Sequence, residues 1–324
     1  MTDVTAGDIE LVARLDGLVR PGAPAAAAVV TPAGSTLAAR AAGLTSDFEI
    51  GSVSKGVTGL LYVDGLARGE ITPDTTLGDL LPLGDCPAAA ATLAAVSAHQ
   101  SGLPRLPRAS RVLRKSVDVW RHGSNPYGES LDELLAQTRA TPLGSARPRY
   151  SNLGFELLGH AIAAAASTTY AELLRERIVQ PLGLPDTYVP ATPDQVRSDA
   201  VDGSAKNGRP RQPWTGEALG PAGGIRSSIT DMARLTAALL DGSAPGIDAL
   251  TPTSRFGPRV QIGAAWITIE MKKGWTVTWH NGGTGGFRSW IGLDREAGTG
   301  VVVLSATTAS VDRAGFALLE NART

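Results

Sequence analysis

Apolar residues recur at two different periods along this chain, and the changes of period predict its elements. Residues 8–19 carry apolar side chains at the spacing of a helix. Residues 25–31 and 35–42 are short apolar runs separated by a Pro-Ala-Gly turn, which is typical of two antiparallel strands. From about 70 to 250 the pattern changes to helices and long loops with no run of strands, and the clearest helices span 129–139, 153–166, 169–179 and 229–241.

The strand pattern returns after residue 258. The expected elements are strands at 260–270, 275–280, 287–293 and 300–305, followed by a closing helix at 311–322. Strands at both ends with helices between them predict an α+β fold, in which one antiparallel sheet flanked by N- and C-terminal helices carries an inserted all-helical lobe. We expect a sheet lobe of residues 1–67 plus 253–324 and a helical lobe of residues 68–252, together one two-lobed unit.

The composition narrows the classes of function. The 324 residues include 30 Lys+Arg and 31 Asp+Glu, a formal net charge of −1, and this balance argues against a nucleic-acid partner. A hydrophobic share of 43% with 19% charged residues is typical of a soluble globular protein. With one cysteine, Cys86, no intrachain disulfide can form, and the four histidines are far apart in sequence, so we expect no metal or other cofactor.

No part of the sequence predicts a secretory signal or a membrane span. The best apolar run near the N-terminus, residues 25–30, is too short for either. We therefore expect a cytoplasmic protein with no membrane partner.

The first candidate chemistry lies where a buried helix is expected to begin, at Ser52 and Lys55. Positions three residues apart share a helix face, and the first turn lies at the positive end of the helix dipole, which suits a nucleophile that generates an oxyanion. Apolar neighbours would desolvate Lys55 and lower its pKa, so that it can act as a base. The plainer interpretation is a serine helix cap followed by a surface lysine, and Ser54 is a rival nucleophile.

Two further segments carry groups suited to the same chemistry. Tyr150 offers a phenolate that a lysine ammonium would stabilise for proton relay, and Asn152 can hold a substrate carbonyl and Lys55. The alternative there is a helix cap with a packed tyrosine. Residues 279–288 are rich in glycine, which allows close approach of another segment and offers a backbone N–H for an oxyanion hole. A glycine-rich hairpin turn gives the same pattern.

Together and in this order, these segments resemble the serine β-lactamase and penicillin-binding-protein superfamily. Within it, the chain is most similar to class C β-lactamases and to the family VIII-type esterases and transacylases related to them. The resemblance covers nearly the whole chain and implies the β-lactamase/transpeptidase-like fold. The segments that carry it are residues 48–55, 98–104, 150–152, 181–187 and 221–227.

The resemblance implies a serine hydrolase or acyltransferase that works through an acyl-enzyme. Ser52 would be the nucleophile, and Lys55 and Tyr150 would share the general-base and general-acid work. The backbone amides of Ser52 and Gly283 would form the oxyanion hole. The residues implied to bind the substrate are Asn152, His280, Asn281, Gly282 and Arg288.

One motif departs from the family pattern. His280-Asn281-Gly282 stands where β-lactamases carry Lys-Thr-Gly, whose lysine helps to hold the substrate carboxylate. A histidine with an ordinary pKa of about 6.5 is mostly neutral at pH 7, so recognition of a carboxylate is weakened. The motif is more similar to that of family esterases, aminopeptidases and transacylases, although Arg288 can restore a positive charge for a β-lactam. A cytoplasmic location also disfavours a lactamase.

We therefore expect an esterase or amide hydrolase that acts on a small-molecule substrate through an acyl-enzyme on Ser52. The alternative is a transacylase that passes the acyl group to an amine or alcohol acceptor in small-molecule biosynthesis. Weaker alternatives are a β-lactamase and a non-catalytic ligand sensor. Sequence does not choose between water and another acceptor, because that choice depends on pocket shape and the exclusion of solvent.

Two smaller patterns lie in the expected helical lobe. Basic residues recur every three or four positions, which predicts either a solvated helix face or a docking face for an acidic partner or an anionic substrate tail, at Arg105, Arg108, Arg111, Arg114 and Lys115. Aromatic residues in loops either line a cleft or pack, at Trp120, Tyr127 and Trp214.

Overall fold

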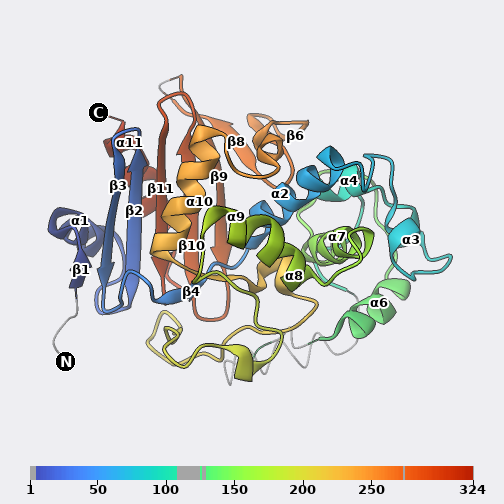
Figure 1. Ribbon diagram of the computed structural model, residues 1–324, viewed down its shortest axis with the longest axis horizontal. Coiled ribbons are helices and arrows are strands. Elements are labelled where there is room, and N and C mark those ends of the chain that lie inside the picture. Colours follow the sequence, from blue (N-terminus) through green and yellow to red (C-terminus); the bar gives the residue numbers. More distant parts are fainter. Residues whose placement is uncertain (1–4, 108–124, 126–128, 273, 324) are drawn as a thin grey trace.

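A nine-stranded antiparallel sheet dominates the structure, a computed structural model that describes residues 5–107, 125, 129–272 and 274–323 (Figure 1). The strand order is β1-β3-β2-β11-β10-β9-β8-β7-β6, and β2 pairs with β11, so the two ends of the chain build one sheet as the sequence predicts. The strands are β1 (Thr5–Gly7), β2 (Ala25–Thr31), β3 (Gly34–Arg40), β6 (Ser254–Gly257), β7 (Val260–Ile262), β8 (Ile267–Glu270), β9 (Thr276–Gly283), β10 (Arg288–Asp294) and β11 (Thr299–Ser305).

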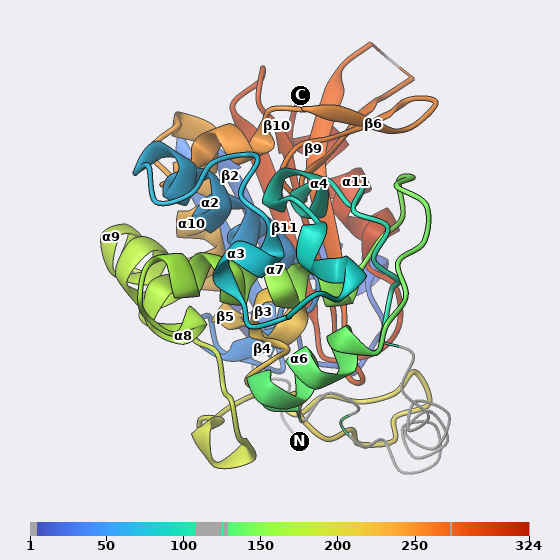
Figure 2. The ribbon, with the colours of Figure 1, turned by 90° about the vertical axis from the view of Figure 1, so that its right-hand side faces the viewer.

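The helices form two groups. Three of them cover the sheet, and most of the others lie beside it in the part of the molecule that Figure 2 turns toward the viewer. A π-helical turn at Arg175–Val179 joins two short helices, α8 and α9, into one helical segment. In chain order the helices are α1 (Ile9–Leu18), α2 (Val53–Ala67), α3 (Leu77–Leu80), α4 (Leu93–Ser97), α6 (Leu131–Arg139), α7 (Asn152–Ala165), α8 (Tyr170–Leu174), α9 (Gln180–Leu182), α10 (Ile229–Asp241) and α11 (Asp312–Ala322).

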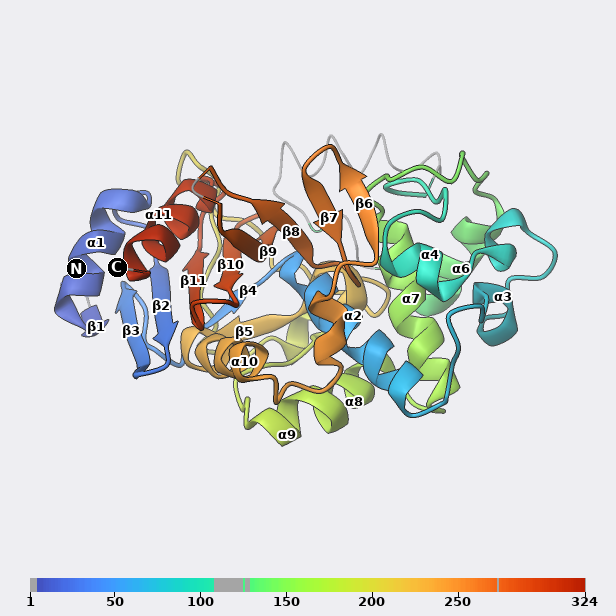
Figure 3. The same cartoon turned by 90° about the horizontal axis from the view of Figure 1, so that it is seen from above.

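Helices on both faces explain why the middle of β11, residues 300–304, is an apolar run. Val301 and Val303 pack with residues of α1 and α11, whereas Val302 and Leu304 join the core beneath α10. Figure 3 shows α11 and α10 on opposite sides of the sheet. Because successive side chains of a strand point to opposite faces, a strand covered on both sides has no position left for a polar residue.

α2 runs through the interior, and its residues are buried around almost the whole circumference, polar ones such as Lys55 included. Its glycines let it lie directly against the segment before β8. A Cβ on Gly59 would lie 2.1 Å from the carbonyl oxygen of Ala264, and one on Gly56 would lie 2.8 Å from the Trp266 ring. The indole Nε1 of Trp266 also donates to the carbonyl of Gly56 at 3.1 Å. These contacts fix the position of the helix whose first turn carries Ser52.

A two-stranded sheet that the sequence did not predict holds the chain just before α2. β4 (Asp47–Glu49) pairs with β5 (Arg226–Ser228), so a strand lies in the stretch expected to have none. The guanidinium of Arg226, only 1% exposed, donates to Asp47 at 2.9 Å and to Glu49 at 3.1 Å. A buried cation is tolerated only with such partners, and these carboxylates bring the two strands together.

Other differences from the expected elements are local. The run at 260–270 forms two strands, β7 and β8, and a strand that was not expected, β6, precedes them. Along the described part of the chain, no helix is both long enough and apolar enough to cross a membrane. The predicted roles of Arg108, Arg111, Arg114, Lys115, Trp120 and Tyr127 fall on positions outside the described residues.

Candidate active site

The turn between β4 and α2 brings Ser52 to the edge of β9. Ser52 is the cap residue of α2, but its side chain makes no capping hydrogen bond, so the hydroxyl is not used to hold the helix. Gly51 has a φ of +50°, and a Cβ there would lie 2.6 Å from the amide nitrogen of Gly283. Only glycine allows this approach, which sets the backbone before Ser52 against the amide of Gly283.

Lys55 is fully buried one turn into α2. Its Nζ donates to Ser52 Oγ at 3.2 Å and to the carbonyl oxygen of Ala222. Burial lowers the pKa of Lys55 to about 7, with Glu156 opposing the shift and Arg105 adding to it. The interpretation of a serine cap followed by a surface lysine is therefore wrong, because the hydroxyl does not cap and the lysine does not reach the surface.

Ser54, the rival nucleophile, is fully buried. Its Oγ accepts a hydrogen bond from the backbone N–H of Ile225 at 3.2 Å. The side chain does not line the cavity described below, whereas Ser52 does. Ser54 thus connects α2 to the segment before β5.

Tyr150 completes a cluster with Ser52 and Lys55. Its hydroxyl hydrogen-bonds the Ser52 side chain, and Lys55 Nζ lies 4.9 Å from the centre of its ring. His99 stacks on the same ring at 4.6 Å, and its Nδ1 accepts from the backbone N–H of Ser151 at 3.2 Å, which fixes the loop before α7. Burial raises the pKa of Tyr150 to about 12, so the resting side chain is a phenol, and its expected part in proton relay stays a prediction.

β9 crosses the nucleophile turn at Gly282. A Cβ at this position would lie 2.0 Å from the carbonyl oxygen of Ile50 and 2.3 Å from Ser289 Oγ. Ser289 Oγ in turn donates to that same carbonyl at 2.6 Å. The glycine-rich segment therefore allows the close approach of two backbones, because the turn that carries Ser52 lies directly on the strand.

His280 lies behind Tyr150, with a ring-to-ring distance of 6.4 Å, and is buried. Its Nδ1 is 2.7 Å from the carbonyl oxygen of Asn281. Burial, with a smaller effect of the charge on Lys55, lowers the pKa of His280 to about 4, so the imidazole is neutral at pH 7. The Asn281 side chain donates to Asp312 at 3.1 Å, which connects β9 to α11.

Two guanidinium groups face the cavity beside Ser52, which has a volume of about 470 Å³. Arg288 donates to the carbonyls of Thr284 and Phe287 at 3.0 and 2.8 Å. Arg105 lies over the Tyr150 ring at 6.0 Å. The lining is Ser52, Arg105, Tyr150, Trp214, Asn281, Gly282, Gly283, Thr284, Arg288, Ser310 and Asp312.

The sequence named Arg105 only within the basic series, as part of a solvated helix face or of a docking face for an acidic partner or an anionic substrate tail. Its periodic neighbours suggested a helix face, but its carbonyl accepts from the backbone N–H groups of Asn152 and Leu153 and so caps α7, while its side chain lines the cavity. The signal available in sequence was its position directly after the 98–104 segment. Trp214 lines the cavity, which is one of the two roles that the sequence allowed for it. Its backbone N–H donates to Glu49 at 2.8 Å.

Glu156 and Ala222 are two further groups that sequence reasoning missed. Glu156 is fully buried on α7, and burial raises its pKa to about 8, with the charge on Lys55 opposing the shift. Ala222 supplies through its carbonyl the second acceptor for Lys55. Asn152 is the first residue of α7, and its expected role in holding Lys55 and the substrate stays a prediction.

Across the described residues, no group of three or more His, Cys, Asp or Glu side chains is placed to hold a metal ion. The chemistry that the cavity can perform with its own groups is that of a serine hydroxyl beside a desolvated amine and a protonated phenol. Such a set can activate a hydroxyl, hold its proton and return one to a leaving group.

Comparisons with known proteins give relatives of the chain by sequence and by fold. A family model described as Beta-lactamase matches residues 11–322. The D-alanyl-D-alanine-carboxypeptidase/endopeptidase AmpH of Escherichia coli (strain K12) is 31% identical over 195 residues, which are 59% of this chain and 48% of that protein. Unguisins hydrolase ungD' of Aspergillus campestris (strain IBT 28561) is 28% identical over 253 residues, 70% of this chain and 45% of that protein.

The chain thus spans about half the length of these curated relatives. A solved structure titled "A class C beta-lactamase" superimposes with a TM-score of 0.80 at 17% identity and covers 97% of this chain and 95% of its own. At that identity the likeness establishes the fold.

Proposed function

The chain belongs to the beta-lactamase family and is an enzyme of its serine hydrolase superfamily, and we propose that it is an esterase or amide hydrolase for small substrates that carry an anionic group. The acyl-enzyme forms on Ser52. The observation that carries the proposal is a lysine with no exposure to solvent, its Nζ 3.2 Å from Ser52 Oγ and its pKa about 7. An ordinary lysine has a pKa of about 10.4 and is almost wholly protonated at pH 7, whereas this one supplies a free base.

In the acylation step, Ser52 Oγ bonds to the substrate carbonyl carbon and its proton passes to the neutral Nζ of Lys55. The carbonyl oxygen becomes an oxyanion that accepts from the amides of Ser52 and Gly283, each worth roughly 3–4 kcal/mol in the transition state. Collapse of this intermediate breaks the bond to the leaving oxygen or nitrogen, which takes the hydroxyl proton of Tyr150. Lys55 then returns its proton to Tyr150. Water repeats the sequence on the acyl-enzyme.

The charge of the cavity supports the choice of substrate. His280 is neutral where β-lactamases have a lysine, but Arg105 and Arg288 both line the cavity. Arginine binds carboxylates through two parallel hydrogen bonds, so two guanidiniums beside the nucleophile favour a substrate with a carboxylate near the scissile bond. Asp312 also lines the cavity, with one oxygen engaged by Asn281. The AmpH relative is named as a carboxypeptidase, and a carboxypeptidase cleaves the amide bond of a C-terminal residue, which carries a carboxylate.

The test is intact-mass analysis with steady-state kinetics on a matched pair, 4-nitrophenyl butyrate and 4-nitrophenyl hemisuccinate, and on benzylpenicillin. We expect a transient adduct of one acyl group, turnover in water alone, and a higher kcat/KM for the hemisuccinate. Ser54→Ala serves as the matched control for Ser52→Ala. Release of product only after addition of an amine or alcohol would identify a transacylase instead, and faster turnover of the penicillin would identify a β-lactamase. An adduct that never leaves would favour a sensor.

A further inference from the structure

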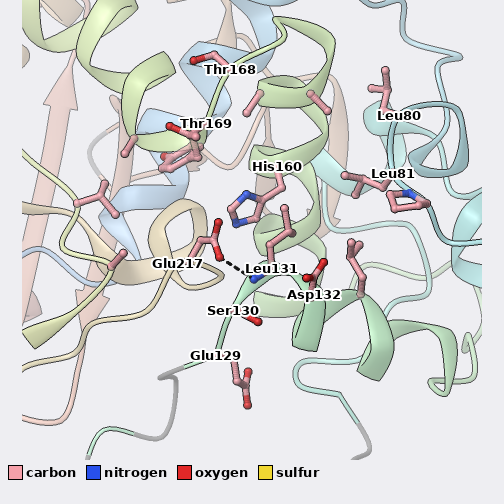
Figure 4. Close-up of a pocket in the computed structure, with 18 of the residues that line it drawn as sticks. Leu80, Leu81, Glu129, Ser130, Leu131, Asp132, His160, Thr168, Thr169 and Glu217 are labelled. Carbon is pink, nitrogen blue, oxygen red and sulfur yellow. Dashed lines mark hydrogen bonds between the residues drawn. The ribbon is translucent and has the colours of Figure 1, made fainter.

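A second cavity, of about 660 Å³, lies among the helices beside the sheet and shares no lining residue with the cavity at Ser52. Its walls come from α6, from α7 and from the start of α8 (Figure 4). His160 on α7 is eight residues beyond Asn152, about 12 Å along the helix axis. The lining is Leu80, Leu81, Pro82, Glu129, Ser130, Leu131, Asp132, Leu135, His160, Ala163, Ala164, Thr168, Thr169, Tyr170, Ala171, Val189, Ala191, Thr192 and Glu217.

The buried polar group of this cavity is His160. It is 6% exposed, and its Nε2 is a buried nitrogen without a hydrogen-bond partner. In Figure 4 its imidazole is directed toward Glu217 and Leu131. A buried polar atom left unpaired costs about 1–3 kcal/mol, so a ligand that pairs with it gains that amount of interaction.

Burial keeps His160 neutral. It lowers the pKa of the imidazole below the ordinary value, although the charge of Glu217 and hydrogen bonds of the imidazole with the backbone of Ala218 and Glu217 oppose the shift. A neutral imidazole has one N–H and one lone pair, and in the tautomer protonated at Nδ1 the unpartnered Nε2 accepts a hydrogen bond and repels no cation. The group that completes this tautomer is a donor.

The charges around the cavity have one sign. The titratable lining groups besides His160 and Tyr170 are the carboxylates of Glu129, Asp132 and Glu217, and no lysine or arginine of the described chain lines it. Glu217 is fixed in place, since its Oε2 accepts from the backbone N–H of Leu131 at 3.0 Å, the bond drawn in Figure 4. A fixed carboxylate facing a lone-pair acceptor selects a cationic donor over an anion.

The walls are apolar and already in place. Leucine, valine and alanine side chains supply about half of the lining residues. Tyr170 is fixed by its hydroxyl, which lies 2.7 Å from Thr58 Oγ1 on α2, and its ring meets His160 edge-on at 6.3 Å. Pockets of roughly 300–1,000 Å³ that are apolar, preformed and carry few polar groups are typical of small-molecule sites.

We propose that this cavity is a binding site for a small apolar amine, whose ammonium group donates to His160 Nε2 and to the carboxylate of Glu217 while its hydrocarbon body lies against the leucines of α6 and of the segment after α3. The site is separate from Ser52, so it stands whether or not the esterase proposal does. It gives the protein a cation-selective site beside an anion-selective one.

The test is isothermal titration calorimetry of the whole protein, without any acyl donor, using 4-phenylbutylamine, 4-phenylbutanol and 4-phenylbutanoate. These probes share a hydrocarbon body and differ in the head group. We expect saturable binding of the amine with one site per chain, at least tenfold weaker binding of the alcohol, and none of the acid. Equal affinity for the amine and the alcohol would overturn the proposal, as would no saturable binding of the amine.

Two variants locate the binding. His160→Phe removes the acceptor, and we expect it to weaken amine binding at least tenfold. Glu217 is exposed, so Glu217→Gln tests the charge without burial of a new group, and we expect a loss of three- to tenfold. Glu176→Gln removes an exposed carboxylate that lines neither cavity and should bind as the wild type does. Wild-type affinity in both His160→Phe and Glu217→Gln would place the amine elsewhere and reject the site.

Discussion

The cavity at Ser52 and the cavity at His160 meet the same physical problem in opposite ways. Each holds buried ionisable groups and a neutral histidine nearby, His280 at one and His160 at the other. The charged groups that line the cavity at Ser52 include the guanidiniums of Arg105 and Arg288, and the buried Lys55 is close to the Ser52 hydroxyl. At His160 the rim carries carboxylates, and the lining has no hydroxyl with a buried amine beside it among the described residues. A buried polar group without a partner can bind a ligand, but catalysis needs a second reactive group within hydrogen-bond distance of the first.

The largest expected effect is on acylation, and it should arise at the cavity beside Ser52 and leave binding at the His160 cavity unchanged. Ser52→Ala removes the nucleophile, and we expect acylation to fall by more than about 10³-fold. The measurement is adduct formation by mass spectrometry with 4-nitrophenyl hemisuccinate. Ser54→Ala should still form the adduct, because that hydroxyl is bonded to Ile225 within the core. Undiminished turnover by Ser52→Ala would reject the assignment of the nucleophile, and the variant should bind 4-phenylbutylamine as the wild type does.

Tyr150→Phe should have the next largest effect. The ring and its stacking on His99 are kept, while the hydroxyl that hydrogen-bonds Ser52 is lost. We expect both acylation and deacylation to slow by about 10²-fold or more, the usual contribution of a positioned acid or base. Stopped-flow rates of the two steps would measure this. Wild-type rates in both steps would remove the tyrosine from the mechanism.

Removal of one positive charge from the cavity at Ser52 should have an effect of intermediate size on kcat/KM. Arg105→Gln should lower kcat/KM for 4-nitrophenyl hemisuccinate about tenfold relative to 4-nitrophenyl butyrate, as expected when one charge-assisted hydrogen bond is lost. The exposed Arg147→Gln variant is the control for overall charge. A uniform loss on both esters would mean that Arg105 acts through Tyr150 or the start of α7 instead of through the substrate.

The smallest expected effect is a shift of the pH profile. Acylation should fall as the pH drops through about 7, because Lys55 gains a proton there and ceases to be a base. An ionised Glu156 stabilises the charged lysine, but burial raises the pKa of Glu156 to about 8, so the carboxyl is only partly ionised near pH 7. Glu156→Gln should therefore move this acid limb to lower pH by well under about one unit. Glu176→Gln should leave the limb in place. A limb that stays put in Glu156→Gln would show that the carboxyl does not govern Lys55.

Much of this architecture follows from the sequence. The apolar runs at 25–31 and 300–305 predict β2 and β11, and the serine–lysine spacing predicts a shared helix face, because period and helix geometry are local properties. The β4–β5 pair could not be predicted, since it depends on Arg226 meeting two carboxylates almost 180 positions away in the chain. The buried carboxyl of Glu156 was missed for the same reason, because its effect on Lys55 exists only once two helices are packed.

The protonation state of Tyr150 at rest could not be predicted from the sequence. The sequence places a cation near a phenol, which favours the phenolate, but it carries no information on how deeply the ring is buried. Burial proves the larger effect and raises the pKa to about 12. The surroundings of Arg105 could not be predicted either. The periodicity of the basic residues suggested a helix face, whereas the backbone carbonyl of Arg105 caps α7.

The crossing at Gly282 has a consequence for comparative genomics. Any β-carbon there would collide with the Ile50 carbonyl, so replacement by alanine would separate the serine-bearing turn from the strand rather than adjust a side chain. Among genes of this lineage, loss of that glycine should therefore mark proteins that have abandoned acyl chemistry, even where the serine and lysine codons persist.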